Sequence, residues 1–314
     1  MKMKRRPALD GKVAIITGAS SGIGEATARE FAQAGAVTVL AARRKERLER
    51  LQEEIEEMGG TALAVPTDIT DIHQIIHLVQ TTVSKFGRID ILANIAGWAL
   101  YQWLEKMSHE QLRRAFDVNV IGMADMMHQV IPVMQRQHSG MIINMSSYAS
   151  RVAVPPLTVY ASTKYAVEGL SDGMRRELLP WGITVMRVHP SSVSGTEFNE
   201  RVVREGGIRY RSLPIGRISR ERLARHLVDL VEHPRREFLI SRLYEPLVFL
   251  NRRFPDLVDM FMSGWVRSKR NDELPPKKSI APVHYRQSHS VSLLPVLGAI
   301  AALALVAHTW RKKT

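Results

Sequence analysis

Short apolar segments alternate with helical patterns along most of this chain, and this alternation limits the possible folds more than any other feature. Between Val13 and Ile240, each apolar run of strand length is followed by a longer segment with helical periodicity. Strands that alternate with helices form parallel sheets, because each helix returns the chain to the same end of the sheet. We therefore expect an α/β fold with a doubly wound, parallel, seven-stranded sheet. The strands are predicted near residues 12–17, 37–41, 61–66, 89–93, 140–145, 183–188 and 236–241.

A glycine-rich turn follows the first predicted strand. The apolar run Val13–Ile16 leads to Gly18, Gly22 and Gly24, and a helical pattern begins at Glu25. Glycines let a backbone approach a pyrophosphate closely, and the start of a helix presents free N–H groups to an anion. A purely structural turn is the alternative. The strand before the turn and the helix after it favour a nucleotide-phosphate site.

Tyr160 and Lys164 stand four residues apart, and Tyr160 follows Ser147 by thirteen residues. On a helix, positions four apart share one face, so the ammonium should lie near the phenol and lower its pKa. A phenol tuned in this way can exchange a proton near neutral pH. Such pairs also arise by chance on ordinary helices, so the pair gains weight only in combination with the glycine turn.

In combination, the glycine turn with Ser147, Tyr160 and Lys164 resembles the short-chain dehydrogenase/reductase family, over residues 8–242. The resemblance implies a Rossmann-like domain that transfers hydride between a nicotinamide cofactor and a carbonyl or secondary alcohol. It also implies a homodimer or homotetramer. Further matching residues occur in the family's order, namely Asp68 after the third strand, Asn94 to Gly97 after the fourth, Asn119 in the next helix and Pro190 after the sixth strand.

Four residues carry the chemistry that the resemblance implies. Tyr160 would exchange a proton with the substrate oxygen, and Ser147 would hydrogen-bond the same oxygen. Lys164 would lower the pKa of Tyr160 and bind the nicotinamide ribose, while Asn119 would hold a water molecule of a proton relay. These roles agree with the need for fixed donors wherever charge develops on an oxygen.

The resemblance also assigns the cofactor contacts. Two residues depart from the family's pattern near them, Ile95 in place of an asparagine and Ser191 in place of a glycine. The implied contacts are Gly18, Ser20, Ser21, Gly22, Ile23, Gly24, Arg43, Arg44, Asp68, Ile69, Asn94, Ala96, Gly97, Tyr160, Lys164, Pro190, Val193 and Thr196.

The end of the second strand favours NADP (NADPH) over NAD. An acidic residue there would bind the ribose 2′-hydroxyl of NAD. This chain has Ala42 followed by Arg43 and Arg44, whose guanidinium groups suit a 2′-phosphate. The alternative is that these arginines only begin the solvated helix predicted for residues 44–58.

The candidate substrate residues are mostly apolar or aromatic, and none is a fixed cation that would select an acid. We therefore expect a lipophilic small molecule, such as a lipid, a steroid or a retinoid-like carbonyl or alcohol. Aromatic residues at these positions are also explained by loop packing. The candidates are Trp98, Tyr148, Leu157 and Phe198, with Tyr101, Trp103 and Val193 as further members.

The C-terminal part reads as three segments. Residues 243–270 mix large apolar and basic side chains and suit either a membrane interface or ordinary packing. Residues 271–290 are polar and read as a linker. Residues 291–310 are almost entirely apolar, followed by basic residues, which predicts a membrane-anchor or transmembrane helix. A helix docked on this protein or on a partner is the alternative.

Composition narrows the remaining possibilities. The chain has no cysteine, which excludes disulfides, and its histidines show no ligand spacing, so we expect no metal site. The net charge of +13 fits anionic lipid better than nucleic acid, because the aromatic stacking residues of a nucleic-acid module are missing. No secretory signal opens the chain, so we expect a catalytic domain on the cytosolic side, anchored by a single C-terminal pass. The rival function is a non-catalytic NADP-binding scaffold at a membrane.

Overall fold

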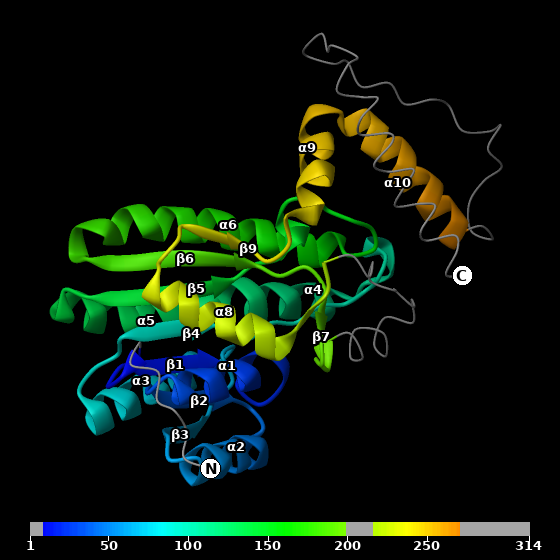
Figure 1. Cartoon of the computed structure of the whole chain (residues 1–314). Helices are drawn as coiled ribbons and strands as arrows, with labels where there is room; N and C mark the ends of the chain where they lie inside the picture. The colour runs from blue at the N-terminus through cyan, green and yellow to red at the C-terminus, as the bar shows by residue number, and fades with distance from the viewer. Residues whose placement is uncertain (1–8, 199–215, 271–314) are drawn as a thin grey trace, which may run out of the picture. The chain divides into compact units, whose positions relative to one another are not determined.

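A computed structural model of the chain describes residues 9–198 and 216–270 (Figure 1). Contacts within the molecule divide it into two units, Met1–Arg242 and Leu243–Thr314. The first unit contains every candidate catalytic and cofactor residue. The predicted linker at 271–290 and the predicted anchor helix at 291–310 lie outside the described residues.

The first unit is built on a parallel sheet with the strand order β3-β2-β1-β4-β5-β6-β9. All seven predicted strands are confirmed, with ends shifted by at most a few residues. A short parallel pair, β7 with β8, was not predicted. The strands are β1 Val13–Thr17, β2 Val37–Ala42, β3 Thr61–Pro66, β4 Ile91–Asn94, β5 Gly140–Met145, β6 Ile183–His189, β7 Val193–Ser194, β8 Ile218–Ser219 and β9 Glu237–Leu239.

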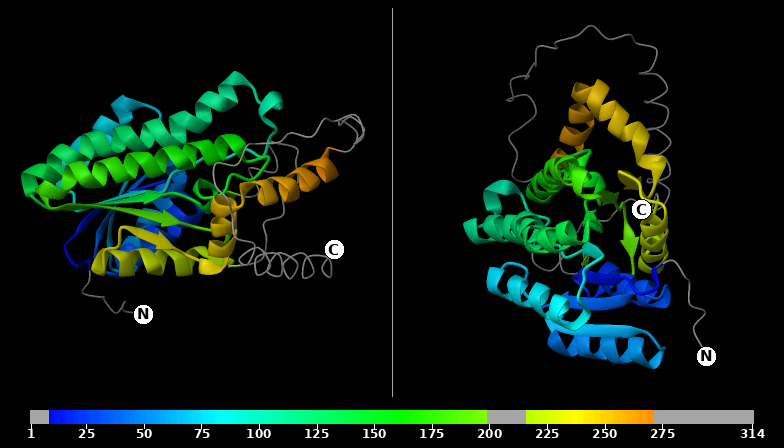
Figure 2. Two further views of the ribbon diagram at one scale, coloured as in Figure 1. Left: turned by 90° about the horizontal axis from the view of Figure 1, so that it is seen from above. Right: turned by 90° about the vertical axis from the view of Figure 1, so that its left-hand side faces the viewer.

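Helices cover both faces of this sheet, which confirms the doubly wound architecture. Figure 2 shows α5 and α6 on one face and α8 on the other. Neighbouring residues of β1 alternate between the two cores, as the period of a strand requires, with Ala14 and Ile16 in one and Val13 and Ile15 in the other. The helices of this unit are α1 Gly22–Gln33, α2 Lys45–Glu57, α3 Ile72–Phe86, α4 His109–Phe116, α5 Gly122–Gln137, α6 Thr158–Leu178 and α8 Arg220–Glu232.

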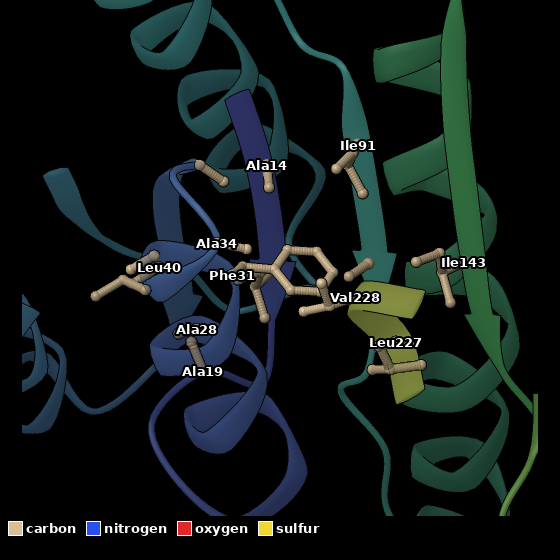
Figure 3. Packing of buried hydrophobic residues seen from close by; sticks show 14 of the residues in the cluster. Ala14, Ala19, Ala28, Phe31, Ala34, Leu40, Ile91, Ile143, Leu227 and Val228 are labelled. Carbon is tan, nitrogen blue, oxygen red and sulfur yellow. The ribbon is translucent and has the colours of Figure 1, made fainter. Parts of the chain in front are cut away.

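One of the two cores contains α1, α2 and α8. Phe31 of α1 is fully buried there, and Val228 of α8 belongs to the same cluster (Figure 3). The small residues Ala14, Ala28 and Ala34 surround these larger side chains and let the helices approach the sheet closely. This packing sets the start of α1, and therefore the glycine turn, against the end of β1.

Two local features define the helices before the site. A capping box is present at the start of α4, where Ser108 and Gln111 make both reciprocal hydrogen bonds. Between α4 and α5 the chain forms a π-helical turn, Asp117–Ile121, that the periodicity did not predict. Such turns widen a helix locally and are common at functional sites, and this one contains Asn119.

The second unit contains α9 Glu245–Arg253 and α10 Pro255–Lys269. Its described core is small and consists of Leu250, Phe254 and Val258, with Leu257 and Met262 packed against it. Among the described residues, no helix combines the length and the apolar character needed to cross a membrane.

Candidate active site

The predicted site residues gather at one edge of the sheet. Because all neighbouring strands of the large sheet are parallel, their carboxyl ends share that edge. Gly18 follows β1, Arg43 follows β2, Asp68 lies just beyond β3, Ser147 follows β5 and Pro190 follows β6. The order reverses between β1 and β4, which is where doubly wound folds bind dinucleotides.

The glycine turn leaves no room for side chains at two positions. A Cβ on Gly18, whose φ is +73°, would lie 2.9 Å from the Cα of Ala96. A Cβ on Gly24 would lie 2.3 Å from the carbonyl oxygen of Gly18. Both contacts are shorter than van der Waals packing allows, so only glycine lets the turn fold back on the start of α1. The resulting arrangement suits a pyrophosphate held at a helix N-terminus.

Thr17 joins the ends of β1 and β4 beside this turn. Its hydroxyl accepts hydrogen bonds from the backbone N–H groups of Ile95, at 3.0 Å, and Ala96, at 3.1 Å. The side chain of Asn94 is buried and donates to Asn144 at 2.9 Å. The Asn94 side chain therefore braces β4 against β5.

Tyr160, Lys164 and Ser147 come together at the edge. The spacing predicted the shared face of Tyr160 and Lys164, and the family resemblance implied the position of Ser147. Tyr160 and Lys164 share a face of α6, with Lys164 Nζ 5.6 Å from the centre of the Tyr160 ring. The Ser147 hydroxyl hydrogen-bonds the Tyr160 phenol and accepts from the Ala149 N–H at 3.1 Å. Two hydroxyls can thus meet a single substrate oxygen. Lys164 is buried and donates to the Met145 carbonyl at 2.8 Å.

Burial dominates the ionisation of both titratable groups. It raises the pKa of Tyr160 to about 12, against the opposing effect of the Ser147 hydrogen bond. Burial also lowers the pKa of Lys164 to about 8, while the charge of Glu168 raises it. The prediction that Lys164 holds the phenol pKa below its usual value is wrong for this structure. The reason is that desolvation of the phenolate outweighs stabilisation by an ammonium directed at a carbonyl.

Asn119 is fully buried and tied to two segments. Its Oδ1 accepts from the Trp98 N–H at 2.7 Å, and its Nδ2 donates to the Trp98 carbonyl at 2.8 Å. The same amide nitrogen donates to the Thr163 hydroxyl at 3.0 Å, which in turn donates to the Tyr160 carbonyl. Asn119 therefore links the chain after β4 to the turn of α6 that carries Tyr160 and Lys164.

Arginines lie beside the glycine turn. The Arg44 guanidinium donates to the hydroxyls of Ser20, at 2.9 Å, and Ser21, at 2.7 Å. Arg43 instead pairs with Asp68, 3.8 Å away, and its side chain is mostly exposed. The structure therefore presents Arg44 as the cation at this end of the turn. With the glycine turn, it forms a donor set that fits a phosphorylated dinucleotide.

The other predicted cofactor residues surround this set. Gly22 faces Thr196, whose side chain would touch a Cβ added there at 3.4 Å. Pro190 accepts from the Tyr148 N–H, and Val193 is buried in β7. Ile23 packs against the core that contains α1, α2 and α8. Ile69 is buried in the core on the other face of the sheet, and Ala96 packs against that core. A Cβ on Gly97 would lie 3.5 Å from Asn119 Oδ1.

The predicted substrate residues divide into two groups. Leu157 and Phe198 pack with Tyr160 against buried Ala99 and Tyr101, and the rings of Phe198 and Tyr160 are centred 6.0 Å apart. Trp98 and Tyr148 have other partners. The Trp98 ring lies under the Arg114 guanidinium, and the Tyr148 hydroxyl donates to the Ser241 carbonyl.

A buried ionic cluster behind Ser147 was missed by the sequence reasoning. Glu168 accepts from Ser146 at 2.5 Å and pairs with Arg187 at 3.0 Å. His189 lies between Glu168 and Glu237, and burial lowers its pKa to about 4. The position of Glu168, one turn after Lys164, was a usable signal for its place in the site. Within the described part of the chain, no group of three histidine or acidic residues is arranged to hold a metal ion.

Comparison with known proteins agrees with the fold. The family model described as short chain dehydrogenase matches residues 12–206. An uncharacterized oxidoreductase of Staphylococcus saprophyticus is 39% identical over 194 residues, which cover 61% of this chain and 77% of that protein.

Two solved structures show the same fold bound to different cofactors. A short-chain dehydrogenase/reductase from Burkholderia phymatum, in complex with NAD, is 26% identical, with a TM-score of 0.72 over 80% of this chain and 96% of that one. A metagenomic short-chain oxidoreductase in complex with NADP is 27% identical, with a TM-score of 0.63 over 74% of this chain and 95% of that one. The fold is therefore compatible with either cofactor.

Proposed function

This chain belongs to the short-chain dehydrogenase family, and from that membership we propose an NADP(H)-dependent oxidoreductase that interconverts a carbonyl and a secondary alcohol. The observation that carries the proposal is the grouping of Ser147, Tyr160 and Lys164 beside the glycine turn. The bound cofactor supplies the hydride. The protein supplies a proton donor, a second hydrogen bond to the substrate oxygen and a buried cation.

Tyr160 acts as the proton donor when a carbonyl is reduced. With its pKa raised to about 12 by burial, the phenol is fully protonated at neutral pH. Ser147 donates a second hydrogen bond to the same oxygen and stabilises the negative charge that develops there. Oxidation of an alcohol would use the same groups in reverse, with the Tyr160 phenolate accepting the proton.

Lys164 and Asn119 complete the proposed machinery. With a pKa of about 8, Lys164 is mainly protonated at neutral pH, so its ammonium can bind ribose hydroxyls and replenish the Tyr160 proton. Asn119 holds the Trp98 backbone and the Thr163 hydroxyl, and so fixes the turn of α6 that carries both groups.

The preference for NADP rests on Arg44. Arg44 follows β2, and the last residue of that strand is Ala42 instead of an acidic residue. The Arg44 guanidinium donates to the hydroxyls of both serines in the glycine turn. A 2′-phosphate would meet a guanidinium fork already held in place, whereas a ribose 2′-hydroxyl would lack the carboxylate that binds it in NAD enzymes.

A lipophilic substrate is supported by the surroundings of Tyr160. Ala99, Tyr101, Leu157 and Phe198 form an apolar cluster with its ring. We further propose that the chain acts at the cytosolic face of a membrane, anchored by residues 291–310, and as a dimer or larger homo-oligomer. In the second unit, α9 and α10 expose apolar side chains such as Phe249 and Met260 together with Arg252 and Arg253, which suits contact with anionic lipid.

The catalytic proposal is tested by following NADPH oxidation, with NADH in parallel, over carbonyls from short ketones to steroids and long-chain ketones. We expect turnover with NADPH on the apolar members, reduced about 10²- to 10⁴-fold in Tyr160→Phe. Binding of NADPH without turnover on any carbonyl would contradict it and favour the scaffold. Sedimentation of the full chain with anionic vesicles, against a chain ending at Arg270, tests the anchor separately.

A further inference from the structure

Arg44 of the proposed cofactor site and Arg47 of α2 converge on one carboxylate. The Arg44 guanidinium donates to Glu197 at 3.0 Å, and the Arg47 guanidinium donates to its other oxygen at 2.5 Å. These residues are separated from Glu197 by 153 and 150 positions in the sequence. The contact is therefore not a local pairing along one helix face but a link between the end of β2 and the chain after β7.

Arg44 makes this contact while it also binds the glycine turn. The same side chain donates to the hydroxyls of Ser20 and Ser21, so its planar group is shared between the turn and Glu197. Arg47, with Arg44, holds the pKa of Glu197 down at about 2, and the carboxylate is ionised at any ordinary pH. An anion of the protein itself therefore already pairs with the guanidinium that the proposed function gives to a 2′-phosphate.

The residues on either side of Glu197 face other parts of the site. Thr196 lies against Gly22, where a Cβ would be 3.4 Å from its side chain. The ring of Phe198 lies beside the ring of Tyr160, with the centres 6.0 Å apart. The tripeptide 196–198 thus touches the phosphate turn, the arginines and the catalytic phenol in succession.

We infer that Glu197 is an internal competitor for the 2′-phosphate, and that a 2′-phosphorylated adenosine cofactor must displace it from Arg44 and Arg47 to bind. This inference rests on the proposed NADP preference. A carboxylate and a phosphate cannot share one pair of guanidinium groups without strong repulsion between like charges. Because Phe198 is the next residue, displacement of Glu197 also changes the apolar surface beside Tyr160, and links cofactor choice to the substrate side of the site.

The size of the effect follows from the exposure of the ion pairs. The Glu197 side chain is 38% exposed, and its partners are 28% and 41% exposed. Ion pairs at such partly exposed positions contribute only a small free energy. Their loss should therefore lower the Kd for a competing anion by about three- to tenfold. A cofactor without a 2′-phosphate does not compete with Glu197, so its affinity should not change.

The test measures equilibrium binding of NADPH, NADH and 2′-AMP to the full chain and to Glu197→Gln. We expect Glu197→Gln to bind NADPH and 2′-AMP about three- to tenfold more tightly, with NADH unchanged. Glu49→Gln is the matched control, because it removes one negative charge from an exposed site on α2 where the partner is Lys45. It should leave all three affinities as they are.

Two results would overturn the inference, and they differ in what they say about the proposed function. If NADPH binds more tightly than NADH and Arg44→Leu abolishes that difference, the NADP preference holds. Unchanged or weaker NADPH binding in Glu197→Gln would then show that Glu197 supports the arginines rather than competing. If NADPH and NADH bind equally both in the unaltered chain and in Glu197→Gln, the preference and the inference both fail.

The link to Phe198 has its own measurement. In a Phe198→Trp variant, saturating 2′-AMP should change the tryptophan emission relative to the unaltered chain treated identically. The ligand 2′-AMP carries no nicotinamide, so it cannot act on this position by direct contact at Tyr160. Adenosine 5′-monophosphate should have no such effect. An emission spectrum that does not respond to bound 2′-AMP would overturn this part of the inference.

Discussion

Replacing Glu168 by glutamine should shift the pH dependence of catalysis without removing any group that touches the substrate. Glu168 lies one turn after Lys164 on α6, and its charge raises the pKa of Lys164 against the lowering effect of burial. The Lys164 ammonium loses its proton as the pH rises through that pKa, which is about 8. If catalysis needs the ammonium, activity has an alkaline limb near that value.

The magnitude follows from the separation on the helix. Unit charges about 6 Å apart interact by about 3 kcal/mol at an effective dielectric constant of about 20. About 1.4 kcal/mol corresponds to one pKa unit, so full removal would lower the pKa by about two units. Arg187, at 3.0 Å, already offsets part of the Glu168 charge. We therefore expect the alkaline limb of kcat to move about one to two pH units lower in Glu168→Gln.

The other charges facing Glu168 do not obscure the result. Burial lowers the pKa of His189 to about 4, so this ring stays neutral through the alkaline limb. The Arg187 guanidinium keeps its charge and retains Asp172 and Glu237 as partners. Glutamine can still accept the hydrogen bonds that Ser146 and Ser150 donate to Glu168, which keeps the turn before α6 in place.

The assay is kcat at saturating substrate and cofactor, from mildly acidic to alkaline pH. Glu177→Gln is the control, because it removes one charge from an exposed position on the same helix. Its profile should match that of the unaltered enzyme. An alkaline limb that stays in place in Glu168→Gln, or moves equally in both variants, would refute the argument that Glu168 sets the ionisation of Lys164.

Two further predictions concern packing. Gly24→Ala should abolish NADPH binding in a titration, because its Cβ would lie 2.3 Å from the Gly18 carbonyl oxygen. A Cβ on Gly169 would have nothing within 4 Å, so Gly169→Ala should raise the free energy of unfolding by about 0.5–1 kcal/mol. Similar NADPH affinity in both variants would contradict the prediction for Gly24. Arg187→Met should cost about 3–5 kcal/mol in urea unfolding, because it removes the buried guanidinium that Glu168, Asp172 and Glu237 share, and the exposed Arg236→Met about 1 kcal/mol or less. Equal losses would mean that the Arg187 cluster is not effectively buried.

Much of the fold could be read from local patterns. The strands have a period of two or a continuous apolar run, the helices have a period of 3.6, and their alternation leaves few topologies open. The glycine turn was equally readable, because the demand for a missing Cβ at Gly18 and Gly24 is imposed by backbone geometry. The spacing of Tyr160 and Lys164 predicted their shared face for the same reason.

Other features depend on residues that are far apart in the chain. The sequence around Asn119 does not predict its hydrogen bond to Thr163, and the sequence around Arg44 does not predict its ion pair with Glu197. The direction of the Tyr160 pKa was predicted wrongly, because the pair spacing reveals a nearby cation but not the depth of burial.

The sequence by itself therefore determined the order of the strands and helices along the chain, the glycine turn and the shared helix face of Tyr160 and Lys164, because each follows from periodicity or from spacing within one element. Only the tertiary structure decided how those groups are charged and braced. The reason is physical. Tyr160 and Lys164 lose their contact with water only when the helices pack on the sheet, and this desolvation shifts their pKa values. An ion pair such as Arg44 with Glu197 likewise forms only when distant parts of the chain meet.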